Sequence, residues 1–559
     1  MPTLLSRTAS WLSIGLIPAC LAALPAQAAD PASEQLRDQQ RTLRQLEQQQ
    51  RLEQWRRRPA PTSAREPTTD ERPGGRCWAI PGLRLRGNRQ VSSATLDQAL
   101  RPLLAPCLDV ASINRLLKAI TERYVAAGYP ASRPYLALQP QDGQPLDIVI
   151  VEGFVESIEL SDADLPLSLQ GAFPGLLGNP LYLPDLEQGL DQLNRLRAYD
   201  LGADLLPGAL QGGTRVIIQP RQVGSRWHLD SRLDNRGSEL TGRHRLNLGL
   251  GLDSPLGLND DLRLALVSAV FHAPGQSQSA SLYYTVPYGP WTFALNASWM
   301  RYKAPLPNGR QVSSGTSSLQ GMSLERVLWR NQQGLLSTVA RLDRKALVNR
   351  IDGATTRQQS PTLTTLEAGL NVLWLDGGLW NAYLGVAQSL DWLGAEHPAQ
   401  VPGLATRAHF RKYRANLLHL RQGPAQWPWR WQGELNLQYS REALPAIEQL
   451  LLSDDSAVRG WRQATVAGAS GAVWRNTFSQ PLPIPVPLEI RPQLGLDLGW
   501  TRFNRNAPSQ RLAGASLGVE LARPGNRLRL DYQRALYASD RNQQSLEPGI
   551  WVLEWALSI

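Results

Sequence analysis

Cysteine and histidine, the side chains that most often carry redox or metal chemistry, are scarce in this chain of 559 residues. Of its three cysteines, Cys20 falls in an N-terminal segment that we expect to be removed, which leaves Cys77 and Cys107 as a pair. Two cysteines in an exported protein predict a disulfide. A metal site is the alternative, and it lacks further ligands, because the histidines show no spacing such as H-E-x-x-H. We therefore expect no metal and no cofactor. The six histidines are His228, His244, His272, His397, His409 and His419.

Acidic pairs, which could serve as general acid and base, fall where turns are expected. Asp260-Asp261 and Asp454-Asp455 both lie in turn-like segments, where solvated loop acids are the commoner interpretation. The sequence has neither a phosphate-binding loop of the G-x-x-x-x-G-K type nor a G-x-S-x-G nucleophile elbow. No Ser/His constellation with an orienting acid is recognisable either. The sequence therefore predicts that the protein is not an enzyme.

The tetrapeptide Val458-Arg459-Gly460-Trp461 could fix a loop in place. An arginine presents a planar fork that grips a carboxylate at two points, and it does not lose its charge. Gly460 permits the tight backbone turn that would put Arg459 at the tip of the loop. A loop in a wet, polar setting needs such an anchor, because apolar packing alone is weak there. An ordinary hairpin turn is the alternative for an Arg-Gly pair.

The N-terminus has the features of a secretory signal. Arg7 supplies a positive charge, a short apolar run follows, and Ala26-Gln27-Ala28 fits a small-residue cleavage site. We expect residues 1–28 to be removed as a signal peptide; a lipoprotein signal ending at Cys20 is the alternative. Beyond the signal no run of about 18 apolar residues occurs, which argues against a helical membrane protein.

The next segment, residues 29–58, predicts a helix that is polar on all sides. Leu36 and Leu43 share one side of such a helix, whereas Trp55 lies on the other, so no apolar stripe forms. A helix of this kind needs a polar environment, and a water-filled barrel lumen would provide one. Residues 59–75 are rich in Pro, Thr, Arg and Gly and predict an extended linker.

Residues 76–153 and 154–221 predict two consecutive α+β units of the same kind. The first begins with a strand at Trp78–Leu85 and a helix capped near Ser92, and a second helix and two strands follow. The second unit repeats this order. Its first helix is poorly defined, and Pro184 opens a clear second helix.

From residue 222 to residue 559 the pattern is purely β, with apolar and polar residues alternating over strand after strand. The last strand is the clearest: apolar residues fill every second position from Trp551 to Ile559, and the strand ends on the terminal residue, as barrel assembly signals do. One face of such strands suits lipid and the other a watery lumen. A soluble sandwich is the alternative, but the export signal and the many alternating segments favour a membrane barrel.

The formal net charge of +10 comes from arginine. A basic balance can indicate nucleic acid or an anionic surface as partner. The arginines are spread over strands and loops without clustering on a helix or beside stacking aromatics. We therefore attribute them to a polar lumen and a rim that faces lipopolysaccharide, and we expect no nucleic-acid partner.

This layout resembles the two-partner secretion transporters, the TpsB family of haemolysin secretion/activation proteins, over the whole mature chain. The Y-x-x-x-G-Y and V-x-E-G signatures of that family are matched by Tyr124-Val125-Ala126-Ala127-Gly128-Tyr129 and Ile150-Val151-Glu152-Gly153. The V-R-G-[YF] tetrad of its inward-folded sixth surface loop is matched by Val458-Arg459-Gly460-Trp461, with Trp in place of Tyr or Phe. Its first POTRA domain carries a cysteine pair like Cys77 and Cys107.

The resemblance implies an outer-membrane β-barrel of about sixteen antiparallel strands, preceded by a plug helix and two periplasmic POTRA domains. It also implies that Arg459 pairs with an acid on the inner barrel wall. Asp497, on the expected strand Leu494–Gly499, is our first candidate for that acid, and Glu520 on the next strand is the second. The implied boundaries are a plug helix at 29–58, a linker at 59–75, POTRA domains at 76–153 and 154–221, and a barrel at 222–559.

The function implied by the resemblance is transport in the outer membrane of a Gram-negative bacterium. The POTRA domains would capture one large unfolded exoprotein of the TpsA type, such as a haemolysin, an adhesin or a contact-dependent toxin. A monomeric barrel in contact with outer-membrane lipids and lipopolysaccharide would pass it to the cell surface without ATP. The alternative is a BamA-like assembly factor, which shares the loop but typically carries more POTRA domains and lacks the plug helix.

Overall fold

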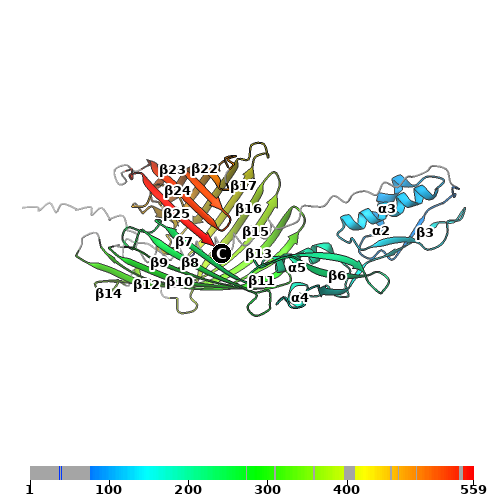
Figure 1. Cartoon of the computed structure of the whole chain (residues 1–559), viewed down its shortest axis with the longest axis horizontal. Coiled ribbons are helices and arrows are strands. Elements are labelled where there is room, and N and C mark those ends of the chain that lie inside the picture. Colours follow the sequence, from blue (N-terminus) through cyan, green and yellow to red (C-terminus); the bar gives the residue numbers. More distant parts are fainter. Residues whose placement is uncertain are drawn as a thin grey trace, which may run out of the picture.

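Figure 1 shows two small α/β units at one end of the molecule and a large barrel at the other. The expected signal peptide and linker lie outside the residues that this computed structural model describes. The expected plug helix also lies outside them, apart from Arg37 and Gln40, which are both helical. The structure describes these two residues and the ranges 76–271, 274–306, 310–356, 359–395, 409–453, 456–463, 465–485, 487–539 and 546–559.

The first unit is a three-stranded sheet covered by two helices. Its sheet has the order β1-β3-β2, with β1 parallel and β2 antiparallel to the central β3. Ser92 and Asp109 cap the two helices, each through its side-chain oxygen. The elements are β1 (Leu83–Arg86), α2 (Ser93–Leu100), η1 (Arg101–Leu103), α3 (Val110–Ala126), β2 (Arg133–Leu136) and β3 (Leu146–Val151).

The first strand is shorter than the sequence predicted. The ladder to β3 begins at Leu83, and Trp78 instead forms an isolated bridge with Leu108. Pro81 and Gly82 lie between these two pairings, and both residue types weaken a strand. The predicted disulfide between Cys77 and Cys107 is confirmed, with 5.6 Å between the two Cα atoms, and it lies beside the Trp78–Leu108 bridge.

The second unit repeats the first, with the sheet order β4-β6-β5. Its poorly predicted first helix is a single turn, capped by Ser168. Phe173, Leu186, Leu193 and Val216 belong to its buried core. The elements are β4 (Phe154–Leu160), α4 (Leu169–Ala172), α5 (Leu183–Asn194), β5 (Tyr199–Pro207) and β6 (Gly213–Val223). Within the described ranges, none of the helices has the length and apolar character needed to cross a bilayer.

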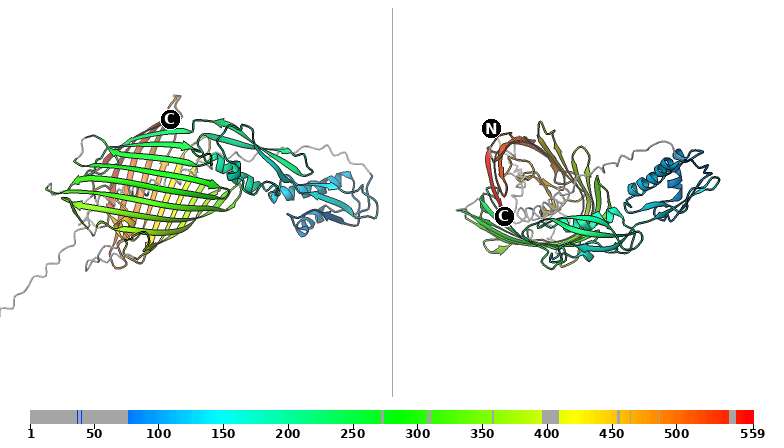
Figure 2. Two further views of the ribbon diagram at one scale, coloured as in Figure 1. Left: turned by 90° about the horizontal axis from the view of Figure 1, so that it is seen from below. Right: turned by 45° about the vertical axis from the view of Figure 1, so that its right-hand side comes forward.

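Apart from a short two-stranded ladder described below, the remaining strands form one closed antiparallel barrel, in which β25 pairs with β7 (Figures 1 and 2). Seventeen strands are linked in it, of which β14 is a two-residue extension beside β13, so sixteen make up the wall. They are β7 (Trp227–Asp234), β8 (Arg245–Asp253), β9 (Asp261–Ala269), β10 (Gln276–Tyr288), β11 (Trp291–Pro305), β12 (Val312–Arg330), β13 (Gly334–Ile351), β14 (Ala354–Thr355), β15 (Thr362–Leu375), β16 (Leu379–Leu390), β17 (Arg411–Gln422), β18 (Arg430–Ser440), β21 (Ser470–Ser479), β22 (Glu489–Arg502), β23 (Ser509–Arg523), β24 (Asn526–Ala538) and β25 (Ile550–Ser558).

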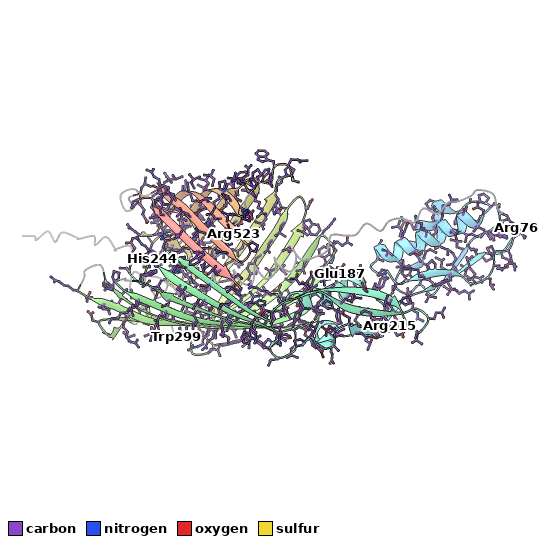
Figure 3. All side chains as sticks on the ribbon, in the orientation of Figure 1. Arg76, Glu187, Arg215, His244, Trp299 and Arg523 are labelled. Atoms are coloured by element: carbon purple, nitrogen blue, oxygen red, sulfur yellow. A yellow bond between two sulfur atoms is a disulfide. The ribbon has the colours of Figure 1, made fainter. Side chains whose placement is uncertain are left out.

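The faces of these strands separate apolar from polar side chains. On β25, Trp551, Leu553 and Trp555 are exposed on the outside, whereas Glu554 between the last two faces inward and pairs with Arg236. Trp299 on β11, labelled in Figure 3, is another of these outward residues. This alternation is what a strand between lipid and a watery lumen requires.

The second unit is fastened directly to the barrel, on the side of the short hairpin turns. Arg330 at the end of β12 donates to Gln188 and Asp191 of α5, at 3.0 and 2.8 Å, and Glu187 lies beside it in the junction (Figure 3). Asn259, in the turn between β8 and β9, exchanges two hydrogen bonds with the backbone of Ser168. These buried polar contacts fix the second unit at the barrel mouth.

Candidate functional site

The segment between β18 and β21, residues 441–469, is called the luminal loop here, because its described parts (441–453, 456–463 and 465–469) fold into the barrel. It contains η3 (Ala446–Glu448), β19 (Leu450–Leu451) and β20 (Ala467–Gly468), and β19 pairs with β20. Its side chains pack against inward-facing residues of the wall, among them Val473, Leu512 and Ala535. The tetrapeptide Val458–Trp461 and its first candidate partner, Asp497, meet at this loop. The cysteine pair and the two other signatures lie in the first unit.

Arg459 and Asp497 come together at the tip of the luminal loop. Two nitrogens of the guanidinium, Nε and Nη2, each lie 2.6 Å from one oxygen of the Asp497 carboxylate. The backbone N–H of Arg459 donates to the same carboxylate at 3.0 Å. The remaining donors reach Ser516 Oγ at 2.9 Å and the carbonyl of Asn476 at 2.7 Å. Both charged side chains are almost completely buried, at 1% and 0% exposure.

The neighbours of Arg459 hold it at that position. Gly460 has φ of +86°, and a Cβ atom there would lie 2.3 Å from the backbone of Arg534 on β24, so only glycine fits. Trp461, the aromatic residue of the tetrapeptide, is fully buried and donates from Nε1 to the carbonyl of Ala513 at 3.0 Å. Val458 is fully buried as well.

Glu520, the second candidate partner, lies elsewhere on the inner wall. It accepts a hydrogen bond from Arg491 at 2.8 Å, in a separate pair between β22 and β23. Arg459 therefore has Asp497 as its acidic partner, with Arg475 as a second, longer neighbour of the same carboxylate at 3.9 Å.

Glu448, which the sequence analysis did not single out, forms a second anchor at the root of the luminal loop. Each oxygen of its buried carboxylate takes one lysine: Lys345 on β13, at 2.5 Å, and Lys412 on β17. The side-chain amide of Gln438 donates to the backbone carbonyl of Glu448. Two of the four lysines of the whole chain thus meet at one carboxylate. That scarcity of lysine is the only sequence signal that could have found the site.

A third set of contacts ties the luminal loop to the line where the barrel closes. The backbone N–H groups of Arg462 and Gln463 donate to Glu547, which precedes β25, at 2.6 and 2.8 Å. The Arg462 guanidinium donates to the carbonyl of Asn235 after β7. The side chain of Asn235 in turn bonds to the backbone of β25 at Trp551 and Leu553.

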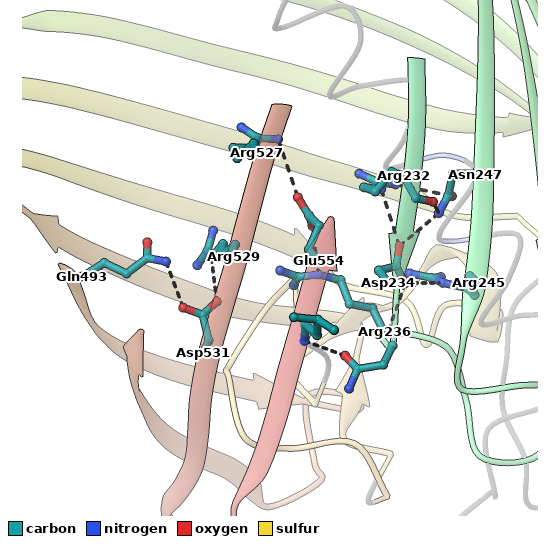
Figure 4. Close-up of polar contacts among 12 residues, drawn as sticks. Arg232, Asp234, Arg236, Arg245, Asn247, Gln493, Arg527, Arg529, Asp531 and Glu554 are labelled. Atoms are coloured by element: carbon teal, nitrogen blue, oxygen red, sulfur yellow. Dashed lines mark hydrogen bonds and ion pairs between the residues drawn. The ribbon is translucent and has the colours of Figure 1, made fainter. Parts of the chain in front are cut away.

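The closing line itself is short and crossed by charge pairs. β25 and β7 pair over Glu554–Ser558 and Asp230–Asp234. Arg236 crosses this line to Glu554 at 3.2 Å, in the network of arginines and acids drawn in Figure 4. Over the described residues, no group of three or more His, Cys, Asp or Glu side chains is arranged to hold a metal ion.

The Y-x-x-x-G-Y and V-x-E-G signatures come together in the first unit. Glu152 accepts hydrogen bonds from the Tyr124 hydroxyl at 2.8 Å and from the backbone N–H groups of Arg89 and Gln90 at 2.7 Å. Burial, together with the bond to this carboxylate, raises the pKa of Tyr124 above its usual range. A Cβ atom on Gly153 would lie 2.4 Å from Ala131. These residues therefore hold the α2–α3 layer against the end of β3.

Both the barrel and the two α/β units are similar to known proteins. Residues 212–521 match the family model described as "Haemolysin secretion/activation protein ShlB/FhaC/HecB", and residues 78–153 and 154–207 match two POTRA-domain models. The hemolysin transporter ShlB of Serratia marcescens is 34% identical over 90% of this chain and 88% of its own. The hemolysin transporter HpmB of Proteus mirabilis is 31% identical over 92% of both chains. The solved structure of CdiB from Escherichia coli is 26% identical and superimposes with a TM-score of 0.84 over 95% of this chain and 99% of that one.

Proposed function

This chain belongs to the haemolysin secretion/activation protein (ShlB/FhaC/HecB) family of two-partner secretion transporters in the outer membrane, and we propose that it exports one large TpsA-type exoprotein. The exoprotein reaches the periplasmic POTRA domains unfolded and leaves through the barrel to the cell surface. No step uses ATP, and folding of the exoprotein outside the cell draws it outward. The observation that carries this proposal is the family match over both the POTRA domains and the barrel.

We further propose that the POTRA domains capture the exoprotein by pairing with an open sheet edge. An extended segment can add to such an edge through main-chain hydrogen bonds. Two other strand edges are less suited to such pairing. On β2, Pro134 lacks an N–H group, and the first half of β4 is already covered by residues 178–181. The outer edge of β5 beyond Leu201 pairs with no other strand of the described chain. Leu205 and Leu206 are exposed there, and we assign the capture edge to it.

The luminal loop, in this proposal, sets whether the barrel conducts. Its tip is held to the wall by Arg459 and Asp497, and a loop so placed blocks part of the bore. Residues 1–28 act as a cleaved signal peptide, residues 29–58 as a plug, and residues 59–75 as the linker that lets the plug leave. The barrel works as a monomer among outer-membrane lipids and lipopolysaccharide.

Export of a large secreted protein encoded beside this chain tests the proposal. Deleting the chain should trap that protein in the cells, the parent chain should restore its export, and Arg459→Ala should fail to restore it. Both chains should migrate as heat-modifiable barrels in the outer membrane. The matched control is Arg491→Ala, which breaks an arginine–glutamate pair of the wall that does not touch the luminal loop. Unimpaired export by the Arg459→Ala chain would contradict the role of the loop.

The deletion strain also distinguishes transport from the alternative function, assembly of outer-membrane barrels. Loss of a BamA-like factor would lower the amounts of many outer-membrane barrels. Loss of a dedicated transporter should leave them unchanged and affect one exoprotein. A general decline of outer-membrane barrels in the deletion strain would therefore favour assembly over transport.

A further inference from the structure

A cavity of about 280 Å³ lies between the luminal loop and the wall formed by β13, β15–β18 and β21. Its volume is far above the ~10–15 Å³ that one water molecule needs. On the loop side, Leu450, Leu451 and Ala457 line it. On the wall side lie five carboxamide side chains, which we call the carboxamide wall: Asn371, Asn381, Asn416, Asn436 and Gln438.

The strand register places much of this wall in one continuous row. Asn371 on β15 pairs with Tyr383 on β16, Tyr383 pairs with Asn416 on β17, and Asn416 pairs with Asn436 on β18. β15, β16 and β17 lie side by side in Figure 1. Since neighbouring strands are about 4.8 Å apart, the row extends across roughly 15 Å of the inner wall. The amide of Asn416 donates to the side-chain oxygen of Asn436, so the two carboxamides are already oriented.

The cavity is balanced in charge, although the chain as a whole is basic. Two arginines and two glutamates line it, and Arg414 pairs with Glu367. A site that selects ions uses a ring of like charges, which is not the arrangement here. The other charged lining residues are Arg341 and Glu434.

Carboxamides carry the same hydrogen-bonding groups as a peptide bond, a carbonyl acceptor and an N–H donor. A row of them can therefore pair with the main chain of an extended polypeptide whatever its sequence. Peptide groups that leave water need such partners, because an unpaired buried polar group is costly. The leucines of the loop side offer the passing side chains an apolar surface. The cavity thus has one face for a main chain and one for side chains.

From this arrangement we infer that the carboxamide wall is a binding site for the main chain of an extended polypeptide in transit through the barrel. This inference rests on the proposed function and specifies the path that the exoprotein takes. Glu448 and Arg459 hold the luminal loop against the wall and thereby keep the loop side of the cavity in place. The chemistry identifies the ligand as a polypeptide of no particular sequence.

The test replaces two members of the wall by residues of similar size. Asn416→Leu combined with Asn436→Leu should lower export about tenfold, the effect expected from losing one or two hydrogen bonds to the passing chain. Asn416→Gln combined with Asn436→Gln should keep most of the export. The matched control is Asn296→Leu on β11, a buried asparagine of the wall that does not line the cavity. Equal export by the double leucine variant and the parent would overturn the inference while leaving the transport function intact, since the parent still exports.

A second measurement covers the case in which the double variant does not assemble. A photo-crosslinking amino acid at position 416 should form an adduct with the exoprotein when cells are illuminated during export. No adduct would overturn the inference. An adduct only with residues 29–58 of the chain itself would also overturn it, because the wall would then bind the plug. If no exoprotein depends on the chain in the deletion strain, the proposed function itself fails, and that result differs from both of these.

Discussion

Replacing Arg459 by methionine should release the tip of the luminal loop. Methionine keeps much of the apolar stem but leaves the fully buried Asp497 carboxylate without its fork of donors. Removing one partner of a buried ion pair costs about 3–5 kcal/mol. We expect a cost near the lower end of this range, because Arg475 lies 3.9 Å from the same carboxylate and can move closer. About 3 kcal/mol corresponds to about a 100-fold rise in the population of the released loop.

Cysteine labelling in intact cells measures that population. Val458 is fully buried between the luminal loop and the wall and does not line the cavity, so Val458→Cys should react slowly with a membrane-impermeant maleimide. Combined with Arg459→Met, its labelling rate should rise about 100-fold, because the thiol reacts only from the released loop. The native cysteines of the described chain do not interfere, since they form a disulfide.

Two further variants in the same background make the measurement specific. Arg491→Met breaks the pair with Glu520 on the same wall and should leave the labelling rate within about twofold of the parent, as for sites that do not interact. Adding Asp497→Asn to Arg459→Met should slow the labelling again, because a neutral amide is less costly to bury unpaired than a carboxylate. Labelling of the Arg459→Met chain at the parental rate would refute the reasoning, and so would an equal rise in the Arg491→Met chain.

Two other predictions concern the second anchor and the disulfide. Glu448→Gln removes the carboxylate that Lys345 and Lys412 both contact, and this should loosen the root of the luminal loop. The rate of proteolysis within residues 441–469 in isolated membranes should then rise about 100-fold or more, the effect of about 3 kcal/mol or more. Glu442→Gln nearby should leave that rate unchanged, and equal digestion of the two variants would contradict the anchor. Replacing both Cys77 and Cys107 by serine removes a disulfide that closes a loop with a sequence separation of 30. The free energy of unfolding of the first POTRA domain should fall by about 3–4 kcal/mol. Denaturant titration of the purified chain in detergent, beside the unsubstituted chain, measures this change, and an unchanged midpoint would contradict the estimate.

Local patterns in the sequence were sufficient to predict most of the fold. The barrel strands could be read because a strand between lipid and water must alternate strictly, as Trp551, Leu553 and Trp555 do. The cysteine pair could be predicted because the N-terminal pattern indicates export and the histidines lack metal-ligand spacing. The prediction of a strand at Trp78–Leu85 was wrong in its first half, because the paired strand begins only at Leu83. Propensity alone does not distinguish a strand from a loop that forms a single bridge, as Trp78 does.

The candidate site was harder to predict, because its contacts join residues far apart in the chain. The resemblance to a family directed attention to Arg459 and Asp497, whereas nothing comparable indicated Glu448 or Glu547. Both of these acids lie in loops, where a single carboxylate is normally solvated. Only the three-dimensional closure of the barrel brings Lys345 and Lys412, from two different strands, to Glu448.

The two anchors of the luminal loop differ in chemistry, and this difference bears on how the loop could move. At the tip, one arginine holds Asp497 through a fixed fork, so a small displacement breaks both bonds at once. At the root, Glu448 is held by two lysines from separate strands, and each flexible ammonium group can follow a shift of the carboxylate. The fork at the tip should therefore open in a single step, and once the bonds of Arg462 and Gln463 to Glu547 also break, the tip can move while the root stays attached. A loop that pivots at its root in this way would widen the cavity beside the carboxamide wall without leaving the barrel.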